Sequence, residues 1–365
     1  MEVYVVNIAI VTLSGFLGST IVKDKIVNDK RKYRWFFLIW APISLICISG
    51  FRYMVGTDYF EYQEIYTAFG GKPLEGLGPE IGFDILSKTL YKISQNPQFF
   101  FFITSIIINV CIIIFLTRHS KNLTLSLYFY LTMGIYYGTM NGLRQYIASM
   151  VMALAFKHII NPNFKKYLIY VLVASLFHTT VFIMVPIYFI ATQKIFSIGN
   201  KIFLAIIAFA FVVYQPFVKI MMFFLGDSKY SGYGDTLLND TNGANILRII
   251  VWMIPIVIAL LFRNKGKELY KDYYYKVVNM SLYGMCFMLL AYRQVFFARL
   301  TMYFDIYYLL LFAMLPNLFD KKLRRVFTYG MIVCFFAYSM ILLLSGEGNI
   351  YPYRYRLSLF WFGGL

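Results

Sequence analysis

The fold is decided by residues 277–316, which read VVNMSLYGMCFMLLAYRQVFFARLTMYFDIYYLLLFAMLP. Two apolar runs, 277–292 and 297–316, each approach the ~20 residues that cross the hydrocarbon core of a bilayer as a helix. Arg293 and Arg299 lie at the junction of these runs. A guanidinium stays charged at any accessible pH, so at a membrane boundary it needs an anion or a watery cavity beside it. Both arginines are therefore candidate functional residues.

The whole chain has the same apolar character. Of its 365 residues, 60% are hydrophobic and only 14% are charged, whereas soluble chains carry about 25% charged residues. We therefore predict an all-α fold, a polytopic helical membrane protein that forms a single integral membrane domain over residues 1–365. The net charge of +17 does not indicate nucleic acid as a partner, because the basic residues gather in short loops and no nucleic-acid-binding motif is present.

The distribution of basic residues also orients the chain. Basic blocks follow the first apolar run and recur at 263–276 and 320–325, which places these loops in the cytoplasm and both termini outside. The number of crossings agrees with the cytoplasmic placement of these loops if the run 167–191 breaks near His178 into two short helices that go out and return. The alternative is one tilted span. About twelve membrane segments result, the two short helices of 167–191 among them. Two outer-face loops follow, 55–97, which is acidic and should contain amphipathic helices, and 226–243.

Two more arginines, Arg52 and Arg144, fall at similar junctions, so four arginines share the outer side that the charge bias disfavours. Arginine clusters bind phosphate or pyrophosphate through paired hydrogen bonds and stabilise a departing phosphate. We therefore expect Arg52, Arg144, Arg293 and Arg299 to bind pyrophosphate. The alternative for each is a side chain that snorkels to the interface or pairs with a carboxylate.

Three side chains on the outer side are candidates for the catalytic base. Asp58, Tyr62 and Tyr66 recur every fourth residue and so share a helical face, where tyrosine rings would stack on sugars and the carboxylate would accept hydroxyl hydrogen bonds. Glu80 precedes a second amphipathic helix, and His178 is suited to move a proton. The alternatives are an interfacial aromatic belt, a favourable charge near a helix N-terminus and a structural histidine. The residues leave the choice among Asp58, Glu80 and His178 open.

The motifs of other enzyme classes are missing from the sequence. There is no phosphate-binding loop, dinucleotide fingerprint or hydrolase nucleophile motif. Three histidines without clustered Cys or Asp give no metal-ligand pattern. We therefore expect neither a metal ion nor a cofactor.

From about residue 50 to 316, the chain resembles the EpsG-like branch of the Wzy-type polysaccharide polymerases. The likeness rests on five short motifs in a fixed order: Gly56-x-Asp58-Tyr59-x-x-Tyr62, Glu80-x-Gly82-Phe83, Leu143-Arg144-Gln145, Phe177-His178, and Arg293 followed by Arg299-x-x-x-Tyr303-Phe304. Residue 83 is Phe where tyrosine is also usual, and residue 81 is Ile where proline is expected. Neither departure removes a charged group.

The resemblance implies a GT-C-like fold and an enzyme of the bacterial cytoplasmic membrane whose active site faces outside. Such an enzyme joins undecaprenyl-pyrophosphate-linked oligosaccharide repeat units of an O-antigen, capsule or exopolysaccharide, without a nucleotide sugar or a metal. The residues expected to bind the glycan are Tyr59, Tyr62, Gln145 and Tyr303. The expected partners are the lipid-linked oligosaccharide, membrane lipid, and a flippase and a chain-length regulator of the same pathway.

Three other functions stay open on the sequence. An O-antigen-ligase-like transferase would use the same donor but make one transfer per acceptor. A transporter or flippase for lipid-linked oligosaccharides would line both leaflets with charged residues, whereas the candidates here gather on one face. A membrane acyltransferase would present a histidine such as His178 to its acyl donor.

Overall fold

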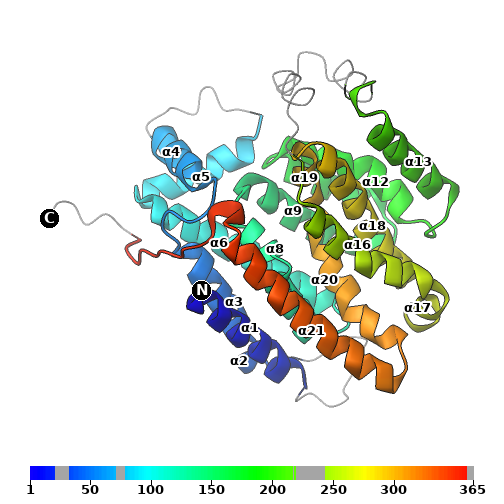
Figure 1. Ribbon diagram of the computed structural model, residues 1–365. Coiled ribbons are helices and arrows are strands. Elements are labelled where there is room, and N and C mark those ends of the chain that lie inside the picture. Colours follow the sequence, from blue (N-terminus) through cyan, green and yellow to red (C-terminus); the bar gives the residue numbers. More distant parts are fainter. Residues whose placement is uncertain (21–32, 71–78, 217, 219–242, 360–365) are drawn as a thin grey trace. The chain divides into compact units, whose positions relative to one another are not determined.

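The computed structural model describes residues 1–20, 33–70, 79–216, 218 and 243–359 (Figure 1). The regular elements of this part are all helices, which confirms the all-α prediction. They are α1 (Glu2–Thr20), α2 (Trp35–Leu38), α3 (Trp40–Gly50), α4 (Tyr59–Gly70), α5 (Ile81–Ile93), α6 (Pro97–His119), α7 (Leu123–Thr132), α8 (Ile135–Gly138), α9 (Leu143–Ala155), α10 (Lys157–Ile160), α11 (Phe164–Ser175), η1 (Thr179–Ile183), α12 (Met184–Ala191), α13 (Ile198–Val212), α16 (Ile246–Leu261), α17 (Arg263–Tyr270), α18 (Asp272–Arg293), α19 (Phe296–Thr301), α20 (Asp305–Met314), η3 (Leu315–Leu318), α21 (Lys321–Leu344) and η4 (Glu347–Asn349).

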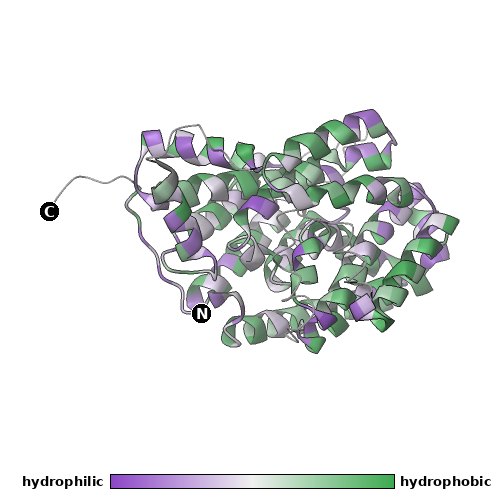
Figure 2. Cartoon of the chain, turned by 90° about the horizontal axis from the view of Figure 1, so that it is seen from above, coloured by the Kyte–Doolittle hydropathy of each residue, from purple (hydrophilic) through white to green (hydrophobic). Residues whose placement is uncertain are grey.

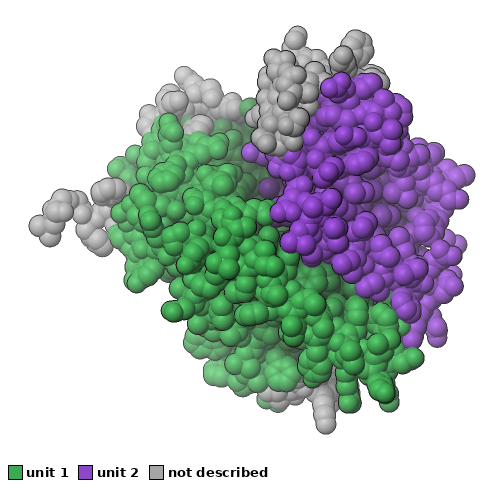
Figure 3. Space-filling view, viewed as in Figure 1, with its two compact units in different colours: residues 1–156, 165–182, 312–365 green, residues 157–164, 183–311 purple. Residues whose placement is uncertain are grey.

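The chain folds as two compact units, coloured green and purple in Figure 3. Unit 1 comprises residues 1–156, 165–182 and 312–365, and unit 2 comprises residues 157–164 and 183–311. The prediction of a single membrane domain stays a prediction. The helices expected within the outer loop 55–97 are α4 and α5, while residues 71–78 of that loop, and the loop 226–243 apart from Gly243, lie outside the described residues.

Unit 1 is assembled around α6. This helix begins at Pro97, which suits a first helical position, and the Asn96 side chain caps it by accepting the Gln98 N–H at 3.0 Å. α3 and α9 pack along α6, and α1 packs on α3 and α7. α4 and α5 pack on each other and against α6. The rings of Tyr62 and Phe83 both contact Phe100, so α4 and α5 gather at the first turns of α6.

The C-terminal part of the described chain returns to the same region. Residues 350–359, here named the C-terminal strap, run beside the turn that follows α3. The Tyr53 N–H donates to the Arg354 carbonyl and the Arg356 N–H to the Phe51 carbonyl, each at 2.9 Å. These backbone hydrogen bonds fix the position of the strap on the first part of the chain.

Unit 2 is arranged around α18, against which α10, α12, α13, α16, α17 and α19 pack. Within α18, the Asn279 amide donates to the Gln193 carbonyl at 2.9 Å. α18 ends at Arg293 and α19 begins at Phe296, so the junction between the two apolar runs is a break between helices. The second run is broken again at 302–304, which the hydropathy pattern did not predict.

The predicted break near His178 is present. α11 ends at Ser175, and the 3-10 helix η1 begins at Thr179. Phe164 at the start of α11 packs against Tyr188 of α12, with ring centroids 5.3 Å apart. The predicted break into two short helices is therefore confirmed, while their path out of and back into the membrane stays a prediction.

Hydrophobic residues run along most helices and lie on their outward faces as well as inside (Figure 2). Exposed apolar side chains recur at helical spacing on α1, α13 and α21, for example Val3, Val6, Ile10 and Leu13, then Ile202, Ile206 and Phe209, then Val326 and Val333. Rows of this kind suit surrounding lipid better than water. The described structure therefore supports a membrane protein.

Judged by length and composition, the described residues form fewer candidate membrane spans than the sequence predicted. Among the described residues α1, α6 and α21 are long and apolar enough to cross a membrane, and a fourth span results if α16 and α17, bent by 76°, are counted together. The other apolar helices have 10–17 residues. At ~1.5 Å per residue these reach about 15–25 Å, short of the ~30 Å hydrocarbon core. The prediction of about twelve segments is not confirmed.

Candidate active site

Three of the predicted site residues meet in unit 1. Glu80 Oε1 lies 2.7 Å from His178 Nδ1, and Glu80 Oε2 lies 3.1 Å from Arg144 Nη1. The Glu80 side chain is 7% exposed, compared with 28% for Arg144 and 19% for His178. A nearly buried carboxylate therefore joins two groups that are partly exposed.

A close backbone approach places Glu80 beside His178. The Gly82 and Phe83 N–H groups both donate to the Leu176 carbonyl, at 2.8 and 3.3 Å. A Cβ at Gly82 would lie 2.8 Å from Leu176 Cβ and 3.0 Å from its carbonyl oxygen, so only glycine permits this approach. Glu80 is the N-cap residue of α5, and His178 follows Leu176 by two positions, so the same contact brings carboxylate and imidazole together.

Arg144 is positioned by the start of α9. Gly142, the N-cap of α9, has a left-handed backbone (φ +55°), and its N–H donates to Asp58 Oδ2 at 2.9 Å. The Arg144 N–H donates to the Tyr62 hydroxyl at 3.4 Å. The guanidinium carbon lies 4.7 Å from the centre of the Phe83 ring. α9 is thereby held to the start of α4, and the Arg144 side chain to the start of α5.

Asp58 and Tyr62 engage protein groups in this arrangement. Asp58 lies just before α4, and its Oδ1 accepts from the Thr57 hydroxyl at 2.9 Å while its Oδ2 caps α9. Tyr62 is buried 5.9 Å from the Phe83 ring centre, and burial raises the pKa of its hydroxyl, so it stays a neutral phenol. The contacts indicate anchoring roles. The roles of Asp58 as base and Tyr62 as glycan ligand stay predictions.

Arg52 is buried, with 1% of its surface exposed. Its Nη1 donates to the Ser49 carbonyl at 2.9 Å and its Nη2 to the Met140 carbonyl at 2.8 Å. Its guanidinium carbon also lies 4.8 Å from the centre of the Phe101 ring. These contacts connect the end of α3 to the loop before α9. Binding of pyrophosphate by Arg52 stays a prediction.

The other candidates lie elsewhere in the two units. Arg293 and Arg299 belong to unit 2 and are exposed. Arg293 Nε donates to the Phe211 carbonyl at 3.2 Å, and the guanidinium carbon lies 5.0 Å from the centre of the ring of the same residue. The remaining predicted glycan ligands are buried: Tyr59 and Gln145 in unit 1 and Tyr303 in unit 2.

The Glu80 cluster, meaning Glu80, Arg144 and His178, offers proton transfer and electrostatic stabilisation. Because Glu80 holds His178 Nδ1, Nε2 is the ring nitrogen that remains to exchange a proton with a hydroxyl. Arg144 uses Nη1 for Glu80, so Nε and Nη2 remain as donors to a phosphate. Among the described residues, no group of three or more His, Cys, Asp or Glu side chains is placed to hold a metal ion. A metal-independent reaction stays a prediction.

The chain matches the model of a known protein family. The model of the EpsG family matches residues 34–355, a range that contains the whole Glu80 cluster. The chain belongs to the EpsG family. The resemblance seen in the sequence is confirmed, and since this family is related to the Wzy-type polymerases, membership indicates a polysaccharide-polymerase-like membrane protein. No curated protein and no solved structure matches the chain.

Two glycines of this EpsG protein position the site; Gly82 belongs to the motif Glu80-x-Gly82-Phe83, but the sequence pattern predicted a positioning role for neither glycine. Gly82 follows Glu80 by two residues, and Gly142 precedes Arg144 by two. Each lies at the start of a helix, where a missing Cβ or a left-handed backbone is needed. A glycine two positions from a candidate charged residue at a helix start was the available signal.

Proposed function

We propose that this EpsG protein polymerises oligosaccharide repeat units carried on undecaprenyl pyrophosphate, at the outer face of the bacterial cytoplasmic membrane and without a metal. Family membership supports the polymerase-like class. The observation that carries the proposed site is the pairing of Glu80 with His178 at 2.7 Å and with Arg144 at 3.1 Å. The Glu80 carboxylate thereby connects His178, the proposed proton acceptor, to Arg144, a proposed phosphate-binding group.

In the proposed reaction, a hydroxyl of the incoming lipid-linked unit attacks the anomeric carbon of the lipid-linked glycan chain. His178 Nε2 accepts the hydroxyl proton, while Glu80 orients the imidazole and stabilises its charged form. The bond between the anomeric carbon and the pyrophosphate oxygen breaks. Arg144 donates hydrogen bonds to the departing undecaprenyl pyrophosphate. The chain is thereby extended at its reducing end.

The stereochemistry follows from single displacement. Direct attack at an α-linked donor carbon inverts its configuration, because the nucleophile enters opposite the leaving pyrophosphate. Isolation of a covalent glycosyl-enzyme would contradict this mechanism. In this proposal Glu80 and Asp58 form no bond to sugar, since Glu80 orients the base and Asp58 caps α9.

We include Arg293 and Arg299 as further phosphate-binding groups. Both are exposed, Arg293 at the end of α18 and Arg299 in the last turn of α19. Arg293 uses its Nε on the Phe211 carbonyl, so Nη1 and Nη2 remain to form a two-point contact with a phosphate.

The test is glycan length, measured by gel, from the purified protein in liposomes supplied with a lipid-linked repeat unit of its host. Wild type should give a ladder of products. Arg144→Ala and Arg293→Ala should give single units only, while Arg118→Ala, at an exposed position near the end of α6, should leave the ladder unchanged. One transfer per acceptor from wild type would instead indicate a ligase. Movement of the substrate between leaflets without any ladder would indicate a transporter.

A further inference from the structure

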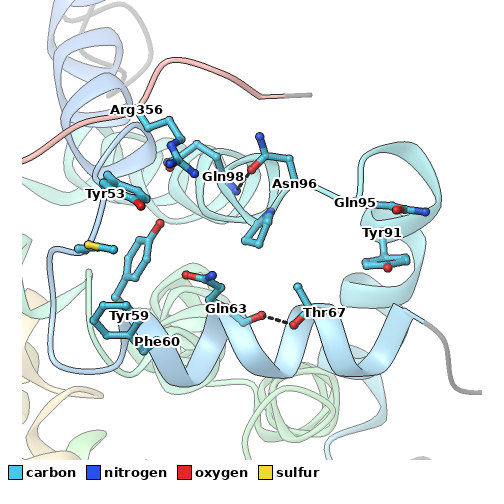
Figure 4. Close-up of a pocket in the computed structure, with 12 residues that line it drawn as sticks. Tyr53, Tyr59, Phe60, Gln63, Thr67, Tyr91, Gln95, Asn96, Gln98 and Arg356 are labelled. Carbon is cyan, nitrogen blue, oxygen red and sulfur yellow. Dashed lines mark hydrogen bonds between the residues drawn. The ribbon is translucent and has the colours of Figure 1, made fainter. Parts of the chain in front are cut away.

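A cavity in unit 1 has no role in the reaction described so far. It lies between α4, the junction of α5 and α6, and the C-terminal strap, and Figure 4 shows the side chains around it. Its volume of about 320 Å³ is at the lower end of the ~300–1,000 Å³ range of small-molecule sites. The cavity is large enough for a compact polar ligand.

α4 separates this cavity from the Glu80 cluster. Tyr59, Gln63 and Thr67 recur every fourth residue on α4 and line the cavity. Tyr62 lies on the neighbouring row of the same helix, where its hydroxyl accepts the Arg144 N–H. A ligand in the cavity is therefore separated from the proposed reacting groups by the width of one helix.

Two aromatic rings of the cavity are supported from behind. Tyr59 stacks on Phe101 with centroids 4.5 Å apart, and Tyr91 packs edge-on against Tyr66 at 5.5 Å. Tyr59 is itself buried, so the half-buried Tyr91 is the ring that presents apolar surface, and it loses little side-chain freedom when a ligand binds. The C–H face of a pyranose ring is the complement of such a surface.

The polar groups of the cavity suit hydroxyls. The side-chain amides of Gln63 and Gln95 have no hydrogen-bond partner in the described part of the chain. Gln98 donates to the Gly50 and Arg52 carbonyls at 2.6 and 3.0 Å, which fixes its amide and leaves its buried Oε1 without a partner among the described residues. The amides of Gln63 and Gln95, which are not buried, can each donate a hydrogen bond to a sugar hydroxyl and accept one from it.

Arg356 brings a positive charge to the cavity from the C-terminal strap. Its guanidinium carbon lies 4.1 Å from the centre of the Tyr53 ring, and its backbone N–H is held by the Phe51 carbonyl. The described lining residues include no carboxylate. The cavity therefore accommodates neutral or acidic sugars and disfavours cationic ligands.

We propose that this cavity is a saccharide-binding site, which holds a sugar of the glycan at a distance from the carbon that reacts. The inference rests on the proposed polymerase function, because a site of this kind retains the glycan between transfers and so lengthens the product. Neither Gln63, Tyr91 nor Arg356 belongs to the Glu80 cluster, so the two sites can be tested separately.

Binding is measured with the soluble repeat-unit oligosaccharide released from the polysaccharide of the host, which carries no lipid or phosphate. The full-length protein in lipid nanodiscs is titrated and followed by saturation-transfer NMR. We expect saturable binding that weakens at least tenfold in Gln63→Ala and in Arg356→Ala. Arg354→Ala, an exposed arginine of the same strap, and Glu64→Ala, an exposed residue of α4, should bind like wild type. Absence of binding to wild type, or equal binding by all variants, overturns the proposal.

The length of the product separates this proposal from the polymerase function. In liposomes, Gln63→Ala and Arg356→Ala should still perform transfers but give a ladder at least twofold shorter than that of wild type and of Arg354→Ala. Binding of the oligosaccharide without any ladder from wild type would sink the polymerase function and leave the saccharide site standing. A wild-type ladder whose length is unchanged in both cavity variants would overturn the retention of the glycan.

Discussion

The amide nitrogen of Gly82 lies 2.8 Å from the carbonyl oxygen of Leu176, and this contact connects the start of α5 to the chain break that carries His178. Glu80 and His178 stand two positions from it on either side. The distance between carboxylate and imidazole therefore depends on a backbone contact that involves neither side chain.

Replacement of Gly82 should separate the two groups. In Gly82→Ala the new Cβ would lie 2.8 Å from Leu176 Cβ, so α5 has to move, at a cost of about 1–3 kcal/mol for such overpacking. We expect a lower midpoint of thermal unfolding and little polymer. Gly330→Ala on α21 is the matched control, because a Cβ there has no neighbour within 4 Å. Equal midpoints and equal polymer yields in the two variants would disprove the positioning role of Gly82.

His178→Asn separates the orientation of the side chain from its chemistry. The Asn amide can donate to Glu80 in place of Nδ1, but it offers nothing in place of Nε2. We expect an unchanged unfolding midpoint and a loss of transfer rate of about 10²–10⁴-fold, the usual contribution of general acid–base catalysis. The rate is measured as polymer formed per unit time in liposomes. A variant with full activity would show that His178 is not the base.

Arg144→Lys keeps the charge and loses the planar fork. Lysine cannot pair with Glu80 and also offer two parallel donors to a phosphate, so activity should fall between that of wild type and Arg144→Ala. For Arg144→Ala we expect about a 10²–10³-fold decrease, as found on removal of one stabilising donor. Initial rates at saturating lipid-linked donor give the comparison. If the lysine variant matches wild type, the two-point contact is refuted.

Substitution of Asp58 distinguishes a role as helix cap from a role as catalytic base. Asp58→Asn keeps an acceptor for the Gly142 N–H, whereas Asp58→Ala removes it at a cost of about 0.5–2 kcal/mol. We expect near wild-type transfer by the Asn variant and a lower unfolding midpoint for the Ala variant. Thermal unfolding and ladder formation are measured on the same preparations. A folded but inactive Asn variant would make Asp58 the base.

Much of the helical pattern could be predicted from the sequence, because apolar runs and basic loops act locally. The break near His178 followed from the parity of crossings, and α11 does end at Ser175. The breaks at Gly134 (φ +83°) and at 302–304 were missed. Hydropathy does not register a change of backbone direction inside an apolar run, and so it overestimates span lengths.

Pairing over long distances in the chain was beyond the sequence. Glu80 is 64 positions from Arg144 and 98 from His178, and no periodicity connects such residues. Phosphate binding by Arg52 stays a prediction; the sequence did not show that its guanidinium is buried beside Phe101 and donates to two backbone carbonyls. For the cavity, the signal available in the sequence was the four-residue spacing of Tyr59 and Gln63, which places both on one face of a helix.

The C-terminal strap also determines when the saccharide cavity is completed during synthesis of the chain. The Tyr353 hydroxyl binds the Ile48 carbonyl across 305 positions of chain, and Arg356 reaches Tyr53 over a similar separation. During synthesis, the α4 side of the cavity is made early. The strap that completes the cavity follows only after all the helices between α4 and residue 350 have been made. A nascent chain that stalls in the membrane therefore lacks the side of the cavity that carries Arg356, and oligosaccharide binding at full affinity reports that synthesis has reached the strap.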